Sequence, residues 1–232
     1  MKKFAVFPNL PQTDWGIRYL LFQLLVLPHL IGWLSVMLNL PITGSQLNLL
    51  CYTINFASLV YLFRHFLKAS LLHAKQNLGA VLGAAVVGYF AFRFATILMD
   101  IGIHYLLPNF SNVNDANINT MAKNQLPLWA FATVVLVPPA EELIFRGALF
   151  GGLYNKSKLL AWLVSVLAFA GLHIASYIGS HSWDVLLISF LQYLPASICF
   201  AAAYRHSGNI FSPILMHAIN NALVMVSLAR MS

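Results

Sequence analysis

Long apolar runs separated by short polar breaks dominate the chain. A transmembrane helix needs about 20 mostly apolar residues, and runs of that length recur along the whole sequence. The candidate spans are seven, at residues 17–38, 47–66, 78–107, 126–150, 159–178, 185–204 and 210–228. The third run is long enough for a span plus an interfacial turn. The pattern therefore predicts an all-α, polytopic transmembrane helix bundle with about seven to eight spans.

The composition supports this interpretation. The chain is 60% hydrophobic and 8% charged, with a mean hydropathy of +0.77, whereas a soluble domain is about 25% charged. We therefore expect one integral membrane domain over residues 1–232, surrounded by membrane lipids. The net charge of +7 does not indicate nucleic acid binding, because the basic residues are scattered and form no run or stripe.

The basic residues occupy alternate connections between the predicted spans. Nearly all of them fall on one face of a seven-span arrangement, and Lys123 is the only Lys or Arg in the opposite connections. The positive-inside rule then predicts a cytoplasmic N-terminus. Residues 66–77 alternate apolar and basic positions, which suits a helix in the membrane interface or, as an alternative, a surface that docks substrate.

Two adjacent carboxylates, Glu141 and Glu142, lie inside the fourth predicted span. They are the only glutamates in the chain, and an ionisable group within a span is costly enough to suggest function. Glu142 and Arg146 are four residues apart on a helix, so they can form an ion pair. Glu141 points about 100° away and has no local partner. An ion pair explains Glu142 but leaves Glu141 as a candidate general base.

His173 follows Phe169 on the fifth predicted span. A lone intramembrane histidine serves interhelical hydrogen bonding as often as catalysis. If the fourth and fifth spans turn near Ser157, Glu141 and His173 lie at similar depth, each roughly 20 Å from the turn. A carboxylate and an imidazole at one depth can hold and deprotonate a water molecule.

His217 and Asn221 share one face of the last predicted span, while Asn220 points elsewhere. Such a pair can bind a metal, stabilise an oxyanion, or join helices by hydrogen bonds. His217 lies only about 15 Å from the preceding loop, which is shallower than Glu141. Arg93 and Asp100, seven residues apart on the third span, are expected to pair with each other, or Arg93 to reach Glu142.

Three motifs combine these residues in order: EExxxR at 141–146, FxxxH at 169–173 and HxxxN at 217–221. Together they resemble the CPBP family (CAAX protease and bacteriocin-processing, also called Abi), which includes the type II CAAX prenyl endopeptidases. The resemblance covers a catalytic core at residues 126–229. It implies an intramembrane protease in the membrane of a bacterial cell.

The resemblance also implies a role for each motif residue. Glu141 and His173 would activate a water, His217 and Asn221 would stabilise the oxyanion, Glu142 and Arg146 would form a supporting pair, and Phe169 would line the cavity. Family members are described both as metalloproteases and as metal-independent glutamate proteases. Zinc, held by Glu141, His173 and His217 with a water, is therefore one alternative and a mechanism without cofactor the other.

The expected function is the hydrolysis of a peptide bond in a peptide or protein substrate that carries a lipid or is a bacteriocin or other peptide precursor. Self-immunity is a related role. Two rival classes stay open from the sequence. A proton-coupled transporter would use Glu141, His173 and Arg93 as a relay, and a non-catalytic membrane immunity protein would act by contact alone.

Overall fold

The computed structural model describes residues 7–123 and 125–231, and these are mostly helical. The helices are α1 (Leu10–Leu25), α2 (Leu27–Met37), α3 (Gly44–Leu62), α4 (Arg64–Gln76), α5 (Leu78–Leu106), α6 (Val113–Ala122), α7 (Leu126–Phe131), the π-helix η1 (Ala132–Leu136), α8 (Val137–Glu142), the π-helix η2 (Leu143–Gly151), α9 (Gly152–Tyr154), α10 (Lys158–Ala175), α11 (Trp183–Ser207) and α12 (Phe211–Met231). Within the described part of the chain the only β-type pairing is one isolated bridge between Ile178 and His181. The all-α prediction is confirmed.

The long helices follow the apolar runs of the sequence. Among the described residues, five helical segments are long and apolar enough to cross a membrane, and the number rises to seven if two bent pairs each count as one span. The pairs are α1 with α2, bent by 48°, and α3 with α4, bent by 74°. Helix α5 runs unbroken through the third apolar run, so this run supplies no separate eighth element.

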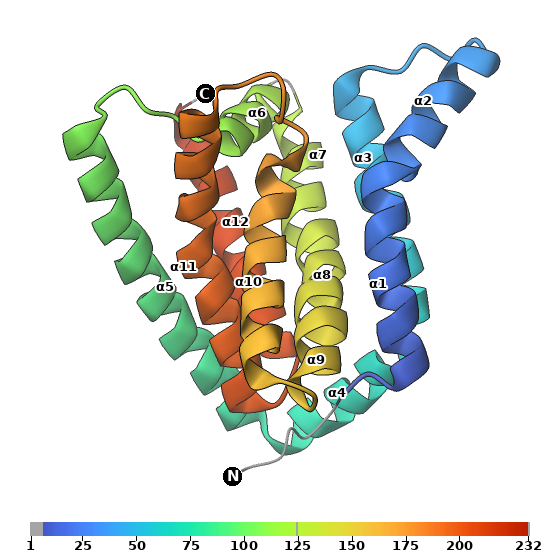
Figure 1. Ribbon diagram of the computed structural model, residues 1–232, viewed down its shortest axis with the longest axis vertical. Coiled ribbons are helices and arrows are strands. Elements are labelled where there is room, and N and C mark those ends of the chain that lie inside the picture. The colour runs from blue at the N-terminus through green and yellow to red at the C-terminus, as the bar shows by residue number, and fades with distance from the viewer. Residues whose placement is uncertain (1–6, 124, 232) are drawn as a thin grey trace.

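Figure 1 shows α10 and α11 beside the rod formed by α7 to α9, with α5 leaning away on one side and α1 to α3 on the other. The connections between α3 and α5, between α9 and α10, and between α11 and α12 lie at the lower end. Arg64, Lys156 and Arg205 lie in these connections or next to them. The predicted basic face is thus one end of the bundle.

Helix α4 crosses this lower end of the bundle (Figure 1). Its buried residues Phe66, Ser70 and Ala74 are spaced by four and form one face, whereas Lys68 and Lys75 are exposed. Asn209, just before α12, donates a hydrogen bond to the carbonyl of Ser70 at 2.8 Å. The amphipathic helix expected from residues 66–77 is present, and the face formed by its buried residues packs against the end of the bundle.

Glycine allows α1 to approach the π-helix η2 closely. A Cβ atom on Gly16 would lie 2.8 Å from Cβ of Ala148 and 2.8 Å from Cζ of Phe63. Ala148 and Phe63 are fully buried, so neither can move aside cheaply. The contact at Gly16 therefore fixes how near the N-terminal helices lie to the rod that carries Glu141 and Glu142.

We expect Gly16→Ala to lower the stability of the protein by about 1–3 kcal/mol, because the added methyl group overpacks this contact. Gly32→Ala on α2 is the matched control, since a Cβ atom added to Gly32 would have no neighbour within 4 Å and alanine favours helix by up to about 1 kcal/mol. Thermal unfolding in detergent measures both. Equal melting temperatures for the two variants would contradict the packing at Gly16.

Candidate active site

A fully enclosed ion pair between Glu142 and Arg146 lies at the centre of the bundle. Oε1 of Glu142 accepts a hydrogen bond from Nη1 of Arg146 at 3.3 Å, and Oε2 lies 3.3 Å from Nε. Both side chains are 0% exposed. Nη2 of Arg146 also donates to the carbonyl and the hydroxyl of Ser197 on α11, at 2.8 Å each. The pair therefore joins the rod to α11 as well as closing one helical turn.

Aromatic rings surround the guanidinium of Arg146. Its central carbon lies 4.4 Å from the ring centroid of Phe169 and 5.4 Å from that of Phe200. Such cation–π contacts stabilise a cation that has left water. Phe169 and Phe200 also line the central cavity, so these rings lie between the guanidinium and the space where a ligand would bind.

Glu141 on the rod and His173 on α10 face each other. Oε2 of Glu141 lies 3.9 Å from Nε2 of His173, with 17% and 13% of their side chains exposed. Nδ1 of His173 is 2.8 Å from the carbonyl oxygen of Phe169. A carbonyl only accepts hydrogen bonds, so Nδ1 must carry the proton. In neutral His173, Nε2 therefore presents a lone pair towards Glu141.

His217 makes a contact that the sequence did not predict. Its Nδ1 lies 3.1 Å from Oε1 of Glu142, so the second carboxylate pairs with an imidazole as well as with Arg146. The ring of His217 stacks on Phe200 with centroids 5.1 Å apart. Glu142, which the sequence explained through Arg146 alone, is thus shared between the ion pair and the last helix.

The apparent difference in depth between His217 and the glutamates has a cause in the backbone. Residues 143–151 form the π-helix η2 rather than an α-helix. The i to i+5 bonds of a π-helix widen the coil, so it advances less per residue than an α-helix. The estimate at 1.5 Å per residue therefore placed the glutamates too far from the lower end.

Asn221 donates a hydrogen bond to the backbone carbonyl of Thr133, which lacks a backbone donor because residue 138 is proline. In the π-helix η1, the N–H of Val137 bonds to the carbonyl of Ala132, so Thr133 would next accept from residue 138. Residue 138 is proline and has no N–H. Nδ2 of Asn221 donates to the carbonyl of Thr133 at 2.8 Å instead. One of its two amide hydrogens thus has a structural use, and the other stays available.

A cavity of about 860 Å³ opens beside these groups. Its walls include Glu141, Phe169, His173, His217 and Asn221. Helices outside the predicted core also contribute, through residues such as His29 on α2, Tyr52 on α3, and Arg93 and Asp100 on α5. The five predicted residues on the rod, α10 and α12 therefore line one shared cavity, while Glu142 and Arg146 lie behind its wall.

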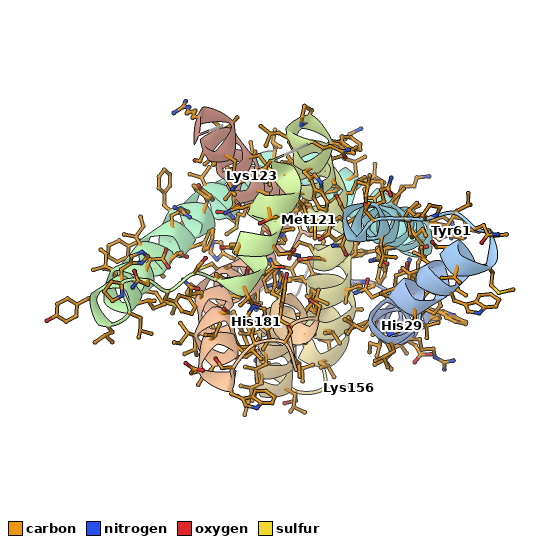
Figure 2. All side chains as sticks on the ribbon, turned by 90° about the horizontal axis from the view of Figure 1, so that it is seen from above. His29, Tyr61, Met121, Lys123, Lys156 and His181 are labelled. Atoms are coloured by element: carbon orange, nitrogen blue, oxygen red, sulfur yellow. The ribbon has the colours of Figure 1, made fainter. Side chains whose placement is uncertain are left out.

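The sequence did not identify Tyr193 or helix α6 as parts of this site. The ring of Tyr193 stacks on His173 with centroids 4.1 Å apart, and its hydroxyl donates to Asp115 at 2.6 Å. Figure 2, seen from above, shows α6 with Met121 across the middle of the upper end, whereas His29 and Tyr61 belong to the group at one side. Only the density of asparagines at 112–119 hinted at a polar wall.

The structure does not assemble the three residues expected for zinc. In the part of the chain that is described, no group of three or more His, Cys, Asp or Glu side chains is arranged to hold a metal ion. His217 turns Nδ1 to Glu142, and Glu141 approaches only His173. This arrangement of side chains does not fit a three-ligand zinc centre, so the chemistry below is derived from the residues alone.

Comparison with known proteins adds independent information. Residues 123–223 match the family model described as "Type II CAAX prenyl endopeptidase Rce1-like". The expected resemblance is confirmed. The Rce1-like region, as we call residues 123–223, includes all seven residues of the three motifs.

Two curated relatives agree with this match. The Bacillus subtilis (strain 168) protein named "Putative membrane peptidase YdiL" is 26% identical over 156 residues, which cover 66% of this chain and 58% of the relative. The Staphylococcus aureus (strain USA300) protein named "Membrane-embedded CAAX protease MroQ" is 26% identical over 155 residues, covering 63% of this chain and 56% of the relative. The matched segments thus span little more than half of these relatives. No solved structure matches the chain.

Arg146→Ala should destabilise the protein strongly, by about 3–5 kcal/mol, because it leaves the Glu142 carboxylate buried without its counter-ion. Arg18→Ala is the control. Arg18 and Asp14 form an ion pair with the same spacing, but their side chains are 64% and 61% exposed, so the loss should be at most about 1 kcal/mol. Thermal unfolding in detergent compares the two, and equal effects would mean that the Glu142–Arg146 pair contributes no more than a surface pair.

Proposed function

We propose that this protein is an intramembrane endopeptidase that hydrolyses a peptide bond with a water activated by Glu141 and His173. The single observation that carries the proposal is the 3.9 Å approach of Oε2 of Glu141 to Nε2 of His173 on the wall of the cavity. The separation is too long for a direct hydrogen bond, and it suits one water molecule between two acceptors. The membership of both residues in the Rce1-like region supports the same reaction.

The proposed reaction begins with a water that donates one hydrogen to Glu141 and the other to His173. Both atoms are acceptors, so the lone pairs of the water are left to attack the carbonyl carbon of the peptide. As the new C–O bond forms, a proton passes to the carboxylate of Glu141. When the C–N bond breaks, this proton is delivered to the leaving amine nitrogen. The carbonyl of Phe169 keeps His173 in the required tautomer throughout.

The oxyanion would be stabilised from α12. The free amide hydrogen of Asn221 is one donor, and its position is fixed by the bond to Thr133. His217 can donate from Nε2 only when both ring nitrogens carry protons, and Glu142 at 3.1 Å from Nδ1 offsets that charge. A preorganised donor of this kind typically contributes about 10²- to 10³-fold to the rate. Glu142 and Arg146 thereby support catalysis through His217.

The site and the two relatives support a proposal for the substrate class. We propose a peptide or protein that enters the cavity from the membrane, with a lipid-modified protein or a bacterial peptide precursor as its two forms. The lining combines apolar rings such as Phe169 and Phe200 with many polar side chains, which supports a segment that brings both apolar side chains and backbone polar groups into the cavity. A bacterial cell membrane, with the N-terminus in the cytoplasm, is the proposed location.

Cleavage of prenylated CAAX peptides and of bacterial leader peptides by the purified protein tests the reaction. We expect Glu141→Gln and His173→Ala each to reduce the rate by at least about 100-fold, as for loss of a general acid or base. His104→Ala, on the exposed end of α5, is the matched histidine control and should cleave normally. Undiminished cleavage by both site variants would exclude the proposed water-activating pair.

The same assay is run with and without a chelator. Activity that disappears with the chelator and returns with zinc would replace the reaction above with a metal-dependent one. Uptake of a solute into proteoliposomes that requires Glu141 would favour the transporter instead, and protection from a bacteriocin that survives Glu141→Gln would favour the contact-only immunity protein. Each rival class thus has its own positive result.

The proposed orientation is tested by cysteine labelling. Lys156→Cys and Ser180→Cys are made separately in a background in which Cys51 and Cys199 are alanine. Both positions are exposed and lie just beyond opposite ends of α10. A membrane-impermeant maleimide should label Ser180→Cys on intact cells and Lys156→Cys only after permeabilisation, since the basic end is expected to face the cytoplasm. The reverse pattern would invert the topology.

A further inference from the structure

Arg93 is a cation placed in the middle of a candidate membrane span. It lies 15 residues from the first residue of α5 and 13 from the last, which corresponds to about 22 Å and 20 Å along the helix. A side chain cannot cover that distance to reach water at either helix end. Burying a cation at such a depth is costly, and arginines found there face a cavity or a partner. Arg93 lines the 860 Å³ cavity.

The carboxylates of the cavity are engaged elsewhere. Oδ1 of Asp100 accepts from Nε2 of Gln192 at 3.0 Å, Asp115 accepts from the hydroxyl of Tyr193 at 2.6 Å, and Glu141 faces His173. The expected pairing of Arg93 with Asp100 or with Glu142 is wrong. Among residues 7–123 and 125–231, no ion pair or hydrogen bond of the Arg93 guanidinium is found.

The only contact described for the Arg93 guanidinium is with the neighbouring ring of Phe92, whose centroid is 5.8 Å away. Phe92 in turn packs against Phe200 with centroids 5.8 Å apart, and Phe200 stacks on His217 at 5.1 Å. This series of rings connects α5 to α11 and α12 at the level of the candidate active site. Arg93 therefore lies on the wall of the cavity near the depth at which a scissile bond would be bound.

We propose that Arg93 binds a carboxylate of the substrate inside the cavity. This inference rests on the proposed function, because it assigns a specificity role at the same site. An arginine presents a planar fork of N–H groups that fits a carboxylate with two parallel hydrogen bonds. The carboxylate has two sources in a peptide: the free C-terminus, in which case the cleaved bond lies close to the end of the substrate, or an acidic side chain.

The test uses peptide libraries on the Glu141→Gln protein, which retains Arg93 but is not expected to cleave. The libraries are equimolar mixtures of N-acetylated apolar hexapeptides, made with a C-terminal carboxylate or a C-terminal amide. In a second pair both libraries have a C-terminal amide, and each peptide contains one Asp in the first library and one Asn in the second. Peptides retained by the detergent-solubilised protein are measured by mass spectrometry. The first pair reports on the C-terminus and the second on a side chain.

We expect at least about tenfold enrichment of the carboxylate member in one of the two pairs, as is typical for a charge-assisted bond. Adding Arg93→Gln should abolish it, while Arg93→Lys should retain part, because lysine keeps the charge but not the fork. Arg64→Gln removes an exposed arginine of α4 and is the charge-matched control that should change nothing.

Equal retention within both pairs would overturn the proposal, and so would enrichment that persists in Arg93→Gln. Melting temperatures of all variants show whether a loss of binding reflects misfolding, and Arg93→Lys supplies a second reading if Arg93→Gln unfolds. The outcome is separate from the proposed reaction. Carboxylate enrichment without cleavage by the wild-type protein would support the Arg93 subsite and reject the endopeptidase. Cleavage without enrichment would support the endopeptidase and reject the Arg93 subsite.

Discussion

The buried pair of Glu142 and Arg146 is the interaction on which the rest of the site depends. Both groups are withdrawn from water, and an isolated charge in such a place would cost several kcal/mol. The cost is offset because both side chains also reach other helices: Arg146 donates to Ser197 on α11, and Glu142 contacts His217 on α12. The rod, α11 and α12 must therefore be aligned along the bundle so that each of them reaches this ion pair.

That alignment also explains why Glu141 faces the cavity. The two glutamates are adjacent on α8, so they point to different sides of the helix. Once Glu142 turns inward to the ion pair, Glu141 is directed to the cavity and to His173. The prolines just upstream contribute in the same way, because the carbonyl that Pro138 cannot bond holds Asn221 on the cavity wall. A backbone defect and a buried charge together orient the polar groups.

Much of this could be predicted from the sequence, and the exceptions have physical causes. Apolar runs and basic breaks predicted the order of the long helices, and helical spacing predicted the pairing of Glu142 with Arg146 and the approach of Glu141 to His173. Spacing on one helix does not say which partner helix a side chain meets. The contact of His217 with Glu142 and the stacking of Tyr193 on His173 therefore required the tertiary structure.

The π-helical segments were hidden for a different reason. A π-helix has no distinct composition, so the pattern of apolar residues does not reveal where i to i+5 bonds replace i to i+4 bonds. Its effect reaches the functional site, since nine residues of η2 bring the glutamates to the depth of His217. The depth of the glutamates along the bundle thus depends on a feature of the backbone that hydrophobic periodicity alone does not measure.

The residues that line the cavity come from two parts of the sequence. The Rce1-like region supplies the rod, α10 and α12 with Glu141, His173, His217 and Asn221. Arg93, Asp100 and Asp115 come from α5 and α6, which precede that region. The cavity is therefore a product of the whole bundle, because its walls need the helices before residue 123 as well as those within the Rce1-like region.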